Sequence, residues 1–189
     1  MFGLFRRNKN DFKVGNIVTL GNFAGPIEWI VLEVKDNKAL LLSKHILFRK
    51  TYDKNHSCTW KTSSLRQYLN GEFYENCFTK SEKNAIITSN INVNSGDTKD
   101  RIFLLSVDEV YKYFKNDQER IAVGLDGRED MWWLRCRGNY DNGPCVPRVA
   151  TVHADGYINA FGSALAYGYY VYNCDGGGVR VALQWNLES

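Results

Sequence analysis

The last third of the chain restricts the fold most, because it carries signals for strands and turns but none for a helix. Ten of the sixteen glycines lie at or after Gly124, and short apolar or aromatic runs stand between them. Glycine destabilises helix interiors, and short apolar runs bounded by turn residues are typical of strands. We therefore predict a β-rich C-terminal third with strands at residues 132–135, 149–153, 157–160, 169–172 and 179–183.

The first part of the chain predicts an antiparallel meander. Residues 14–20, 27–34 and 38–43 are rich in apolar side chains, as strands are. Asp36-Asn37 separates the second run from the third by a few residues, which favours a tight hairpin turn. We expect three neighbouring strands here.

The middle of the chain carries capping boxes, in which Ser or Thr is followed three residues later by Glu or Gln and backbone N–H groups at a helix start are satisfied reciprocally. The boxes are Ser64 with Gln67, Thr79 with Glu82, and Ser106 with Glu109. They predict short helices that end at Asn70-Gly71, at residue 87 and at residue 114. Residues 90–101 are expected to form a loop and residues 102–105 a short strand. The fold class is therefore α+β, with antiparallel strands and two or three short helices.

The size and composition of the chain favour one folded domain. With 189 residues, of which 44% are hydrophobic and 24% charged, the chain resembles a single globular domain, which we place at residues 14–189 after a flexible basic tail at residues 1–13. The formal net charge is only +3, so nucleic acid is not expected as a partner. No run is long and apolar enough for an integral membrane span, and no signal peptide is visible. We expect a cytoplasmic protein with a frayed tail, and docking of the tail on a partner or a membrane is the alternative.

The segment between Arg137 and Leu183 has an unusual set of residue types. It contains no Lys, Glu, Gln, Met or Trp, although all five occur elsewhere in the chain. Tyr, Asn, Asp, Gly, Ala, Ser, Cys, Phe and His follow one another there without a core-like period. Such a mixture suits a binding surface, because Tyr gives a large contact area at low entropic cost while small polar residues adapt.

Three motifs frame this segment: Trp132-Trp133-Leu134-Arg135, Ala154-Asp155-Gly156-Tyr157-Ile158 and Gly178-Val179-Arg180-Val181-Ala182-Leu183. In this order they resemble a bacterial and phage domain of unknown function. That domain is similar to the C-type-lectin-like group, which includes the sulfatase-modifying-factor (formylglycine-generating) domains. The resemblance implies a C-type-lectin-like fold with a loop-rich C-terminal ligand face. The sequence departs from the family where a Ser-Pro-Gly turn is replaced by Cys136-Arg137-Gly138.

Domains of this type recur as the variable proteins of diversity-generating retroelements, in which adenines in the codons of ligand-facing residues are randomised. An Asn codon ending in a pyrimidine, randomised at its two adenines, can encode Tyr, Asp, Ser, Gly, Ala, Cys, Phe or His, but never Lys, Glu, Gln, Met or Trp. The resemblance therefore implies a hypervariable segment at about residues 136–177 in a bacterial or phage-associated protein. A glycine- and tyrosine-rich sheet that lacks the five residue types by chance is the alternative.

Together these observations predict a non-catalytic surface that binds a protein or glycan, without a metal or other cofactor. The predicted contacts are Tyr140, His153, Tyr157, Phe161, Tyr167, Tyr169, Tyr170 and Tyr172, with the polar residues Asn139, Asp141, Asn159, Asn173 and Asp175. Because side chains alternate along a strand, part of this set must point into the core. The five tryptophans are expected to pack inside, and Arg135 and Arg180 to hold the sheet together through a carboxylate or carbonyl groups.

A cysteine-dependent oxidase or hydrolase of the formylglycine-generating type is the alternative function. The five cysteines are odd in number and lack CxxC spacing, which argues against a zinc site and a fully paired disulfide framework. Cys136, Cys145 and Cys174 lie in the relevant third, but the family's active-site motif cannot be placed on any of them. The three histidines are isolated and the acidic residues form no calcium-ligand string, so no metal site is predicted.

Overall fold

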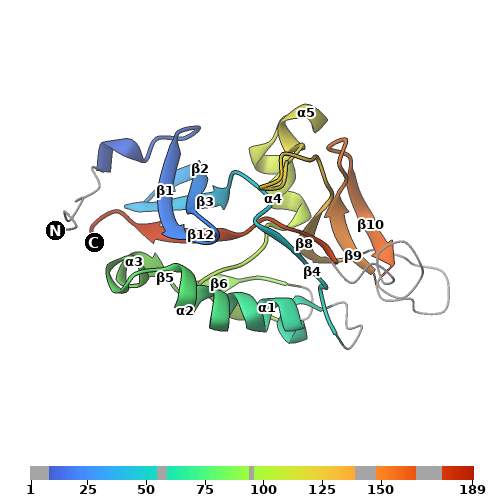
Figure 1. Ribbon diagram of the computed structural model, residues 1–189, viewed down its shortest axis with the longest axis horizontal. Helices are drawn as coiled ribbons and strands as arrows, with labels where there is room; N and C mark the ends of the chain where they lie inside the picture. The colour runs from blue at the N-terminus through green and yellow to red at the C-terminus, as the bar shows by residue number, and fades with distance from the viewer. Residues whose placement is uncertain (1–8, 55–58, 94–95, 139–147, 165–175) are drawn as a thin grey trace.

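The computed structural model describes residues 9–54, 59–93, 96–138, 148–164 and 176–189 (Figure 1). The fold is mixed α+β, and most neighbouring strands are antiparallel. The first sheet has the strand order β1-β2-β3-β12-β5, the second has the order β10-β9-β8-β11-β4, and β6 pairs with β7. In Figure 1 the first sheet lies on the left and the second on the right, with α1 to α3 below them and α4 and α5 above.

The bounds of the elements are as follows. The first sheet contains β1 (Ile17–Asn22), β2 (Pro26–Lys35), β3 (Lys38–Ser43), β12 (Ala182–Asn186) and β5 (Ile86–Ile87). The second contains β10 (Ile158–Ala164), β9 (Arg148–Val152), β8 (Trp132–Arg137), β11 (Gly177–Val179) and β4 (Phe48–Lys50), and the small pair is β6 (Ser89–Ile91) and β7 (Thr98–Asp100). The helices are α1 (Ser64–Tyr68), α2 (Tyr74–Cys77), α3 (Lys80–Ala85), α4 (Val107–Tyr113) and α5 (Asp117–Arg120), with 3-10 turns η1 (Lys9–Asp11) and η2 (Trp60–Thr62) and a π turn η3 (Leu69–Phe73).

The predicted meander is confirmed. β1, β2 and β3 are consecutive antiparallel neighbours. Asp36 and Asn37 have φ angles of 49° and 56°, the left-handed pair that a two-residue hairpin turn requires. Local sequence therefore determines this part of the first sheet.

Two of the three capping boxes are confirmed. Thr79 with Glu82 opens α3, and Ser106 with Glu109 opens α4. The prediction for the first helix is wrong by one residue, because Ser63 caps α1.

Several predicted element ends are also wrong. Asn70-Gly71 does not end the first helix, because the chain continues through η3 into α2. The Asn70 side chain is held by neighbouring backbone, with its Nδ2 donating to Ile102 O at 2.8 Å. The second predicted helix, which is α3, stops at Ala85 instead of residue 87, because the next two residues pair with β12 as β5. Residues 90–101 contain parts of β6 and β7 rather than a loop alone, and within residues 102–105 only an isolated bridge of Phe103 to Ala182 forms.

The chain crosses from one sheet to the other at Arg180-Val181. The predicted strand at residues 179–183 is therefore broken into β11 and β12. The link between β3 and β4 crosses beside it in the opposite sense: Ser43 N donates to Val181 O at 2.8 Å, and Leu47 N donates to Val179 O at 3.0 Å. These two crossings join the sheets into one body.

Arg180 is buried at this junction. Its Nε donates to Ser43 O at 2.9 Å, which confirms the predicted structural role through a carbonyl group. The guanidinium lies 5.1 Å from the ring centre of Trp132 and 5.7 Å from that of Phe114. Burial lowers the pKa of the Arg180 guanidinium, since the protein interior disfavours the charged form.

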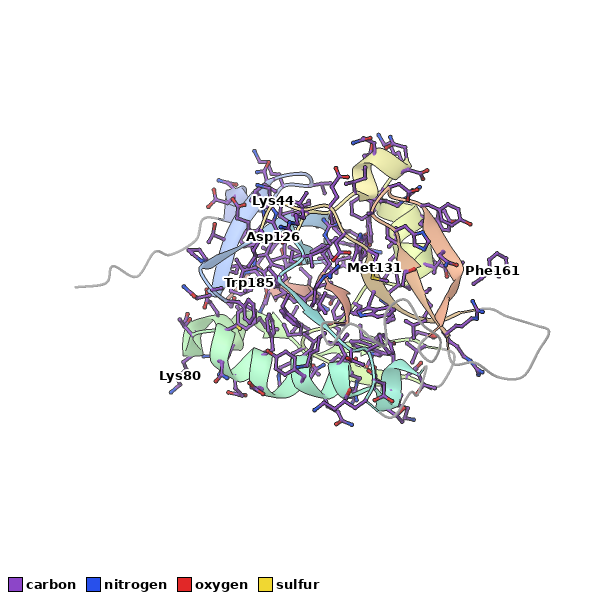
Figure 2. All side chains as sticks on the ribbon, turned by 45° about the vertical axis from the view of Figure 1, so that its right-hand side comes forward. Lys44, Lys80, Asp126, Met131, Phe161 and Trp185 are labelled. Atoms are coloured by element: carbon purple, nitrogen blue, oxygen red, sulfur yellow. The ribbon has the colours of Figure 1, made fainter. Side chains whose placement is uncertain are left out.

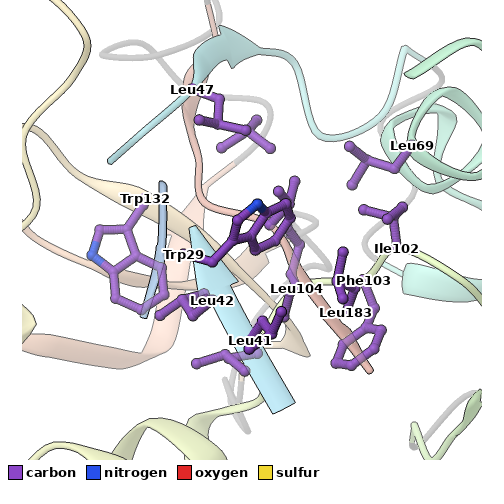
Figure 3. Close-up of a cluster of buried hydrophobic side chains, with 14 of the residues drawn as sticks. Trp29, Leu41, Leu42, Leu47, Leu69, Ile102, Phe103, Leu104, Trp132 and Leu183 are labelled. Carbon is purple, nitrogen blue, oxygen red and sulfur yellow. The ribbon is translucent and has the colours of Figure 1, made fainter. Parts of the chain in front are cut away.

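One hydrophobic core runs through both sheets, and Figure 3 shows part of it around Trp29, Leu42 and Trp132. All five tryptophans are at most 7% exposed, which confirms that they pack inside. Near the N-terminus, Phe12 is buried and stacks on Trp185 with ring centres 6.2 Å apart. The packed part of the chain thus includes Phe12. In the described part of the chain no helix has the length and apolar character needed to cross a membrane.

Candidate functional site

Four of the thirteen predicted contact residues lie in the part of the chain that the structure describes: His153, Tyr157, Asn159 and Phe161. His153 and Tyr157 lie in the turn before β10, and Asn159 and Phe161 lie on that strand. His153 contacts both Tyr157 and Asn159. The other nine lie outside the described residues: Asn139, Tyr140, Asp141, Tyr167, Tyr169, Tyr170, Tyr172, Asn173 and Asp175.

Among the described strands β10 lies at one edge of the second sheet, and two exposed aromatic side chains stand just before it and on it. Tyr157 is 50% exposed and Phe161 is 62% exposed, whereas Ile158 is buried. Figure 2 shows Phe161 projecting from the margin of the molecule. We call the two exposed residues, Tyr157 just before β10 and Phe161 on it, the outer row of β10.

Strand pairing places the two faces of the second sheet in different surroundings. Ile158 pairs with Val152, which pairs with Trp132, and these side chains share one face. Trp132 Nε1 donates to Arg120 O of α5 at 3.2 Å, so α5 covers that face. Asn159 pairs with Thr151, and their side chains belong to the opposite face.

His153 and Asn159 are partly buried and engage each other. The His153 ring packs edge-on against Tyr157, with ring centres 5.7 Å apart, and His153 N donates to Tyr157 O at 2.9 Å. Asn159 Nδ2 lies 3.4 Å from His153 Nε2. These two side chains therefore support the outer row from within.

A bulge displaces Phe161 outward. Asn159 pairs with Thr151 and Ser163 with Val149, so three residues of β10 lie opposite one residue of β9. Gly162 has a φ of 83°, the left-handed region that favours glycine. Asn159 Oδ1 accepts from Gly162 N at 3.0 Å, and Arg148 Nη1 donates to Gly162 O at 3.1 Å.

The turn that enters β10 is fixed by α5. Gly156 N donates to His153 O at 3.0 Å, and Arg120 Nε donates to Gly156 O at 2.9 Å. Arg120 also pairs with Asp117 of the same helix. The sequence analysis predicted neither α5 nor the contacts of Arg120. It also missed the bulge of β10, for which a signal exists, because an isolated glycine within a strand pattern, such as Gly162, indicates a bulge.

Arg135 has the structural role predicted for it. It is buried, its Nη2 donates to Glu109 Oε1 at 2.9 Å, and its Nη1 contacts Glu109 Oε2 and donates to Leu104 O at 2.8 Å. Glu109 is also the capping residue of α4, accepting from Ser106 N at 2.8 Å. The pair joins β8 to α4.

The described cysteines are buried or partly buried. Burial raises the pKa of the Cys136 thiol, and its Sγ accepts from Val107 N at 3.4 Å. Burial likewise raises the pKa of Cys77 to about 11. Reactive thiols have lowered pKa values, so neither environment promotes a nucleophile. Cys58, Cys145 and Cys174 lie outside the described residues.

Two further features lie away from the predicted site. A surface groove of about 480 Å³ runs between residues 46–49 and the loop at residues 124–130, and it contains none of the predicted contacts. Within the described ranges, no three His, Cys, Asp or Glu side chains are grouped as metal ligands.

Comparison with known proteins places most of the chain in one family. Residues 36–187 match the model of a family described as a domain of unknown function (DUF6273). No curated protein and no solved structure matches the chain. The chain therefore belongs to the DUF6273 family of domains of unknown function.

Proposed function

We propose that this chain is a non-catalytic recognition protein with a C-type-lectin-like fold, and that it binds a protein or glycan through the outer row of β10 and the segment at residues 136–177. We further propose that it is the variable protein of a diversity-generating retroelement. The residue types of that segment and the three ordered motifs support both proposals. Cytoplasmic or phage-associated residence follows from the same resemblance.

The observation that carries the proposal is the pair of exposed aromatic rings just before and on β10. Tyr157 and Phe161 are four residues apart and expose half or more of their surface. Tyr111 and Leu125 are similarly exposed, but each stands on a separate element, as scattered surface residues do. Aromatic side chains on a rigid strand provide contact area at low entropic cost, so the β10 pair suits recognition.

The buried thiols favour recognition over catalysis by cysteine. Cys136 lies at the end of β8, close to the proposed surface in sequence, yet burial raises its pKa. A thiol in that state contributes little thiolate at neutral pH. Replacement of Cys136 by Ser is therefore expected to leave ligand binding unchanged, and turnover that is lost on replacing Cys136, Cys145 or Cys174 by Ser would favour the cysteine-dependent enzyme instead.

The genetic part of the proposal is tested by sequencing the DNA around the gene. A reverse transcriptase gene and a near-copy of the codons for residues 136–177, differing at adenines of the copy, are expected. Differences spread evenly over all four bases, or the absence of a copy, would refute diversification and leave the binding proposal to be tested separately.

The binding part is tested with arrayed glycans and a displayed library of protein fragments as probes. A ligand captured by the wild-type protein is expected to be lost when Tyr157 and Phe161 are both replaced by alanine. Val14→Ala is the matched control, because Val14 is 66% exposed and lies shortly before β1 in the chain, and Figure 1 shows β1 on the opposite side of the molecule from β10. A ligand retained by the double variant, or lost equally by the control, would contradict the assignment of the surface.

A further inference from the structure

The amide of Asn159 has a fixed orientation. Its Oδ1 accepts from Gly162 N at 3.0 Å, and a backbone N–H can only donate, so the oxygen must face Gly162. The amide nitrogen then faces His153, with Nδ2 3.4 Å from Nε2. The backbone of the bulge thus determines which end of the amide meets the histidine.

This orientation sets the protonation state in which His153 can make the contact. Asn159 Nδ2 carries only donors, so His153 Nε2 must be the unprotonated acceptor and the ring proton must be on Nδ1. A second proton on the ring turns Nε2 into a donor that faces another donor. Asn159 can relieve this conflict by rotating away or by turning its amide over, and either movement breaks its bond to Gly162 N.

The charged and aromatic residues in the turn that contains His153, and those of α5 beside it, make contacts of their own. Asp155 Oδ1 accepts from Tyr157 N at 3.0 Å, and the Tyr157 ring packs against the imidazole. From α5, Arg120 donates to Gly156 O and pairs with Asp117. Histidine side chains in general change charge between about pH 5 and 8.

We propose that Asn159 and unprotonated His153 are positioning residues that hold the β10 bulge and its exposed Phe161, and that protonation of His153 releases this hold. Where it concerns ligand binding, the inference rests on the proposed function. Its structural part, the hold on Gly162, can be measured without any ligand.

The test follows hydrogen exchange at the Gly162 amide by NMR, from pH 7.5 to pH 5.0, beside the titration of the His153 ring. After correction for intrinsic exchange, protection is expected to fall about five- to tenfold, the effect of losing one hydrogen bond. The fall should follow the titration of His153. His153→Gln, which keeps an acceptor but does not titrate, should show no fall, and Asn159→Ala should have low protection at both pH values.

Protection that stays constant while His153 titrates, or that falls equally in His153→Gln, overturns the inference. With a ligand from the arrays, wild-type binding should weaken at pH 5.0 while His153→Gln binding does not. Equal binding at both pH values with constant Gly162 protection overturns the inference and leaves the proposed function intact. If protection of the Gly162 amide falls with pH but the ligand still binds after Tyr157 and Phe161 are replaced by alanine, the hold on the bulge is supported and the proposed binding surface is wrong.

Discussion

Replacing Gly156 with alanine tests how firmly the turn before β10 is held against α5. An added Cβ would overlap Asp117 O and lie 2.6 Å from its carbonyl carbon, and these backbone atoms cannot retreat unless α5 moves. The φ of 85° adds strain, because a left-handed conformation costs a non-glycine residue about 1–2 kcal/mol. Overpacking contributes about 1–3 kcal/mol, and displacement of α5 weakens the hydrogen bond from Arg120, worth about 1.5–3 kcal/mol.

These contributions are not strictly additive, and together they predict a loss of about 4 kcal/mol, or a Tm lower by about 10 °C for a chain of this size. Thermal unfolding followed by circular dichroism measures the change. Gly127→Ala is the matched control, because Gly127 has a φ of 79° but nothing within 4 Å of the added Cβ. The control should lose only about 1–2 kcal/mol, the strain of the left-handed conformation. Equal losses in the two variants would refute the contact between the turn and α5.

Three further outcomes are expected. Arg135→Met should destabilise the fold by about 3 kcal/mol, because it leaves the partly buried Glu109 carboxylate without the Arg135 guanidinium. In a double-mutant cycle measured by urea unfolding, adding Glu109→Gln should recover part of this loss. Strictly additive losses would contradict the coupling between the two residues. Burial raises the pKa of the Cys77 thiol from 9.0 to about 11, so this thiol loses its proton at lower pH in the unfolded chain than in the folded one. The free energy of unfolding should keep its full value below pH 9 and fall by up to about 3 kcal/mol as the pH rises to 11. A free energy that does not change with pH, or a fall that persists in Cys77→Ala, would contradict this prediction. Replacing Tyr157 and Phe161 with serine should change Tm by less than about 2 °C, because both side chains are largely exposed, and a drop as large as that of the glycine variant would show that they are structural.

Features set by local sequence could be predicted. The hairpin at Asp36-Asn37 and the boxes at Thr79 and Ser106 depend on residues within one turn of each other, and all three form. The burial of the five tryptophan side chains could be predicted from their size and apolar character, because burying an indole ring contributes a large favourable free energy.

Features set by distant partners could not be predicted. The sequence at Arg180-Val181 reads as continuous strand, and only the crossing near Ser43 breaks it. The four-residue helix α5 has too short a pattern to detect, yet it fixes the turn at Gly156. In the candidate site, composition identified the aromatic residues, whereas the roles of His153 and Asn159 depend on a side-chain contact that residue type alone does not show.

The position of β12 affects how the chain folds as it is made. Synthesis runs from the N-terminus, and β12 is the last of the described strands to emerge, although it lies between β3 and β5 in the first sheet. β11, which emerges just before it, joins β4 to β8 in the second. Neither sheet can therefore gain its full set of described strands before the end of this stretch of chain has been made. We expect both sheets to close late in synthesis, because until β11 and β12 emerge the edges of β3, β4 and β8 stay unpaired and open to chaperones and proteases.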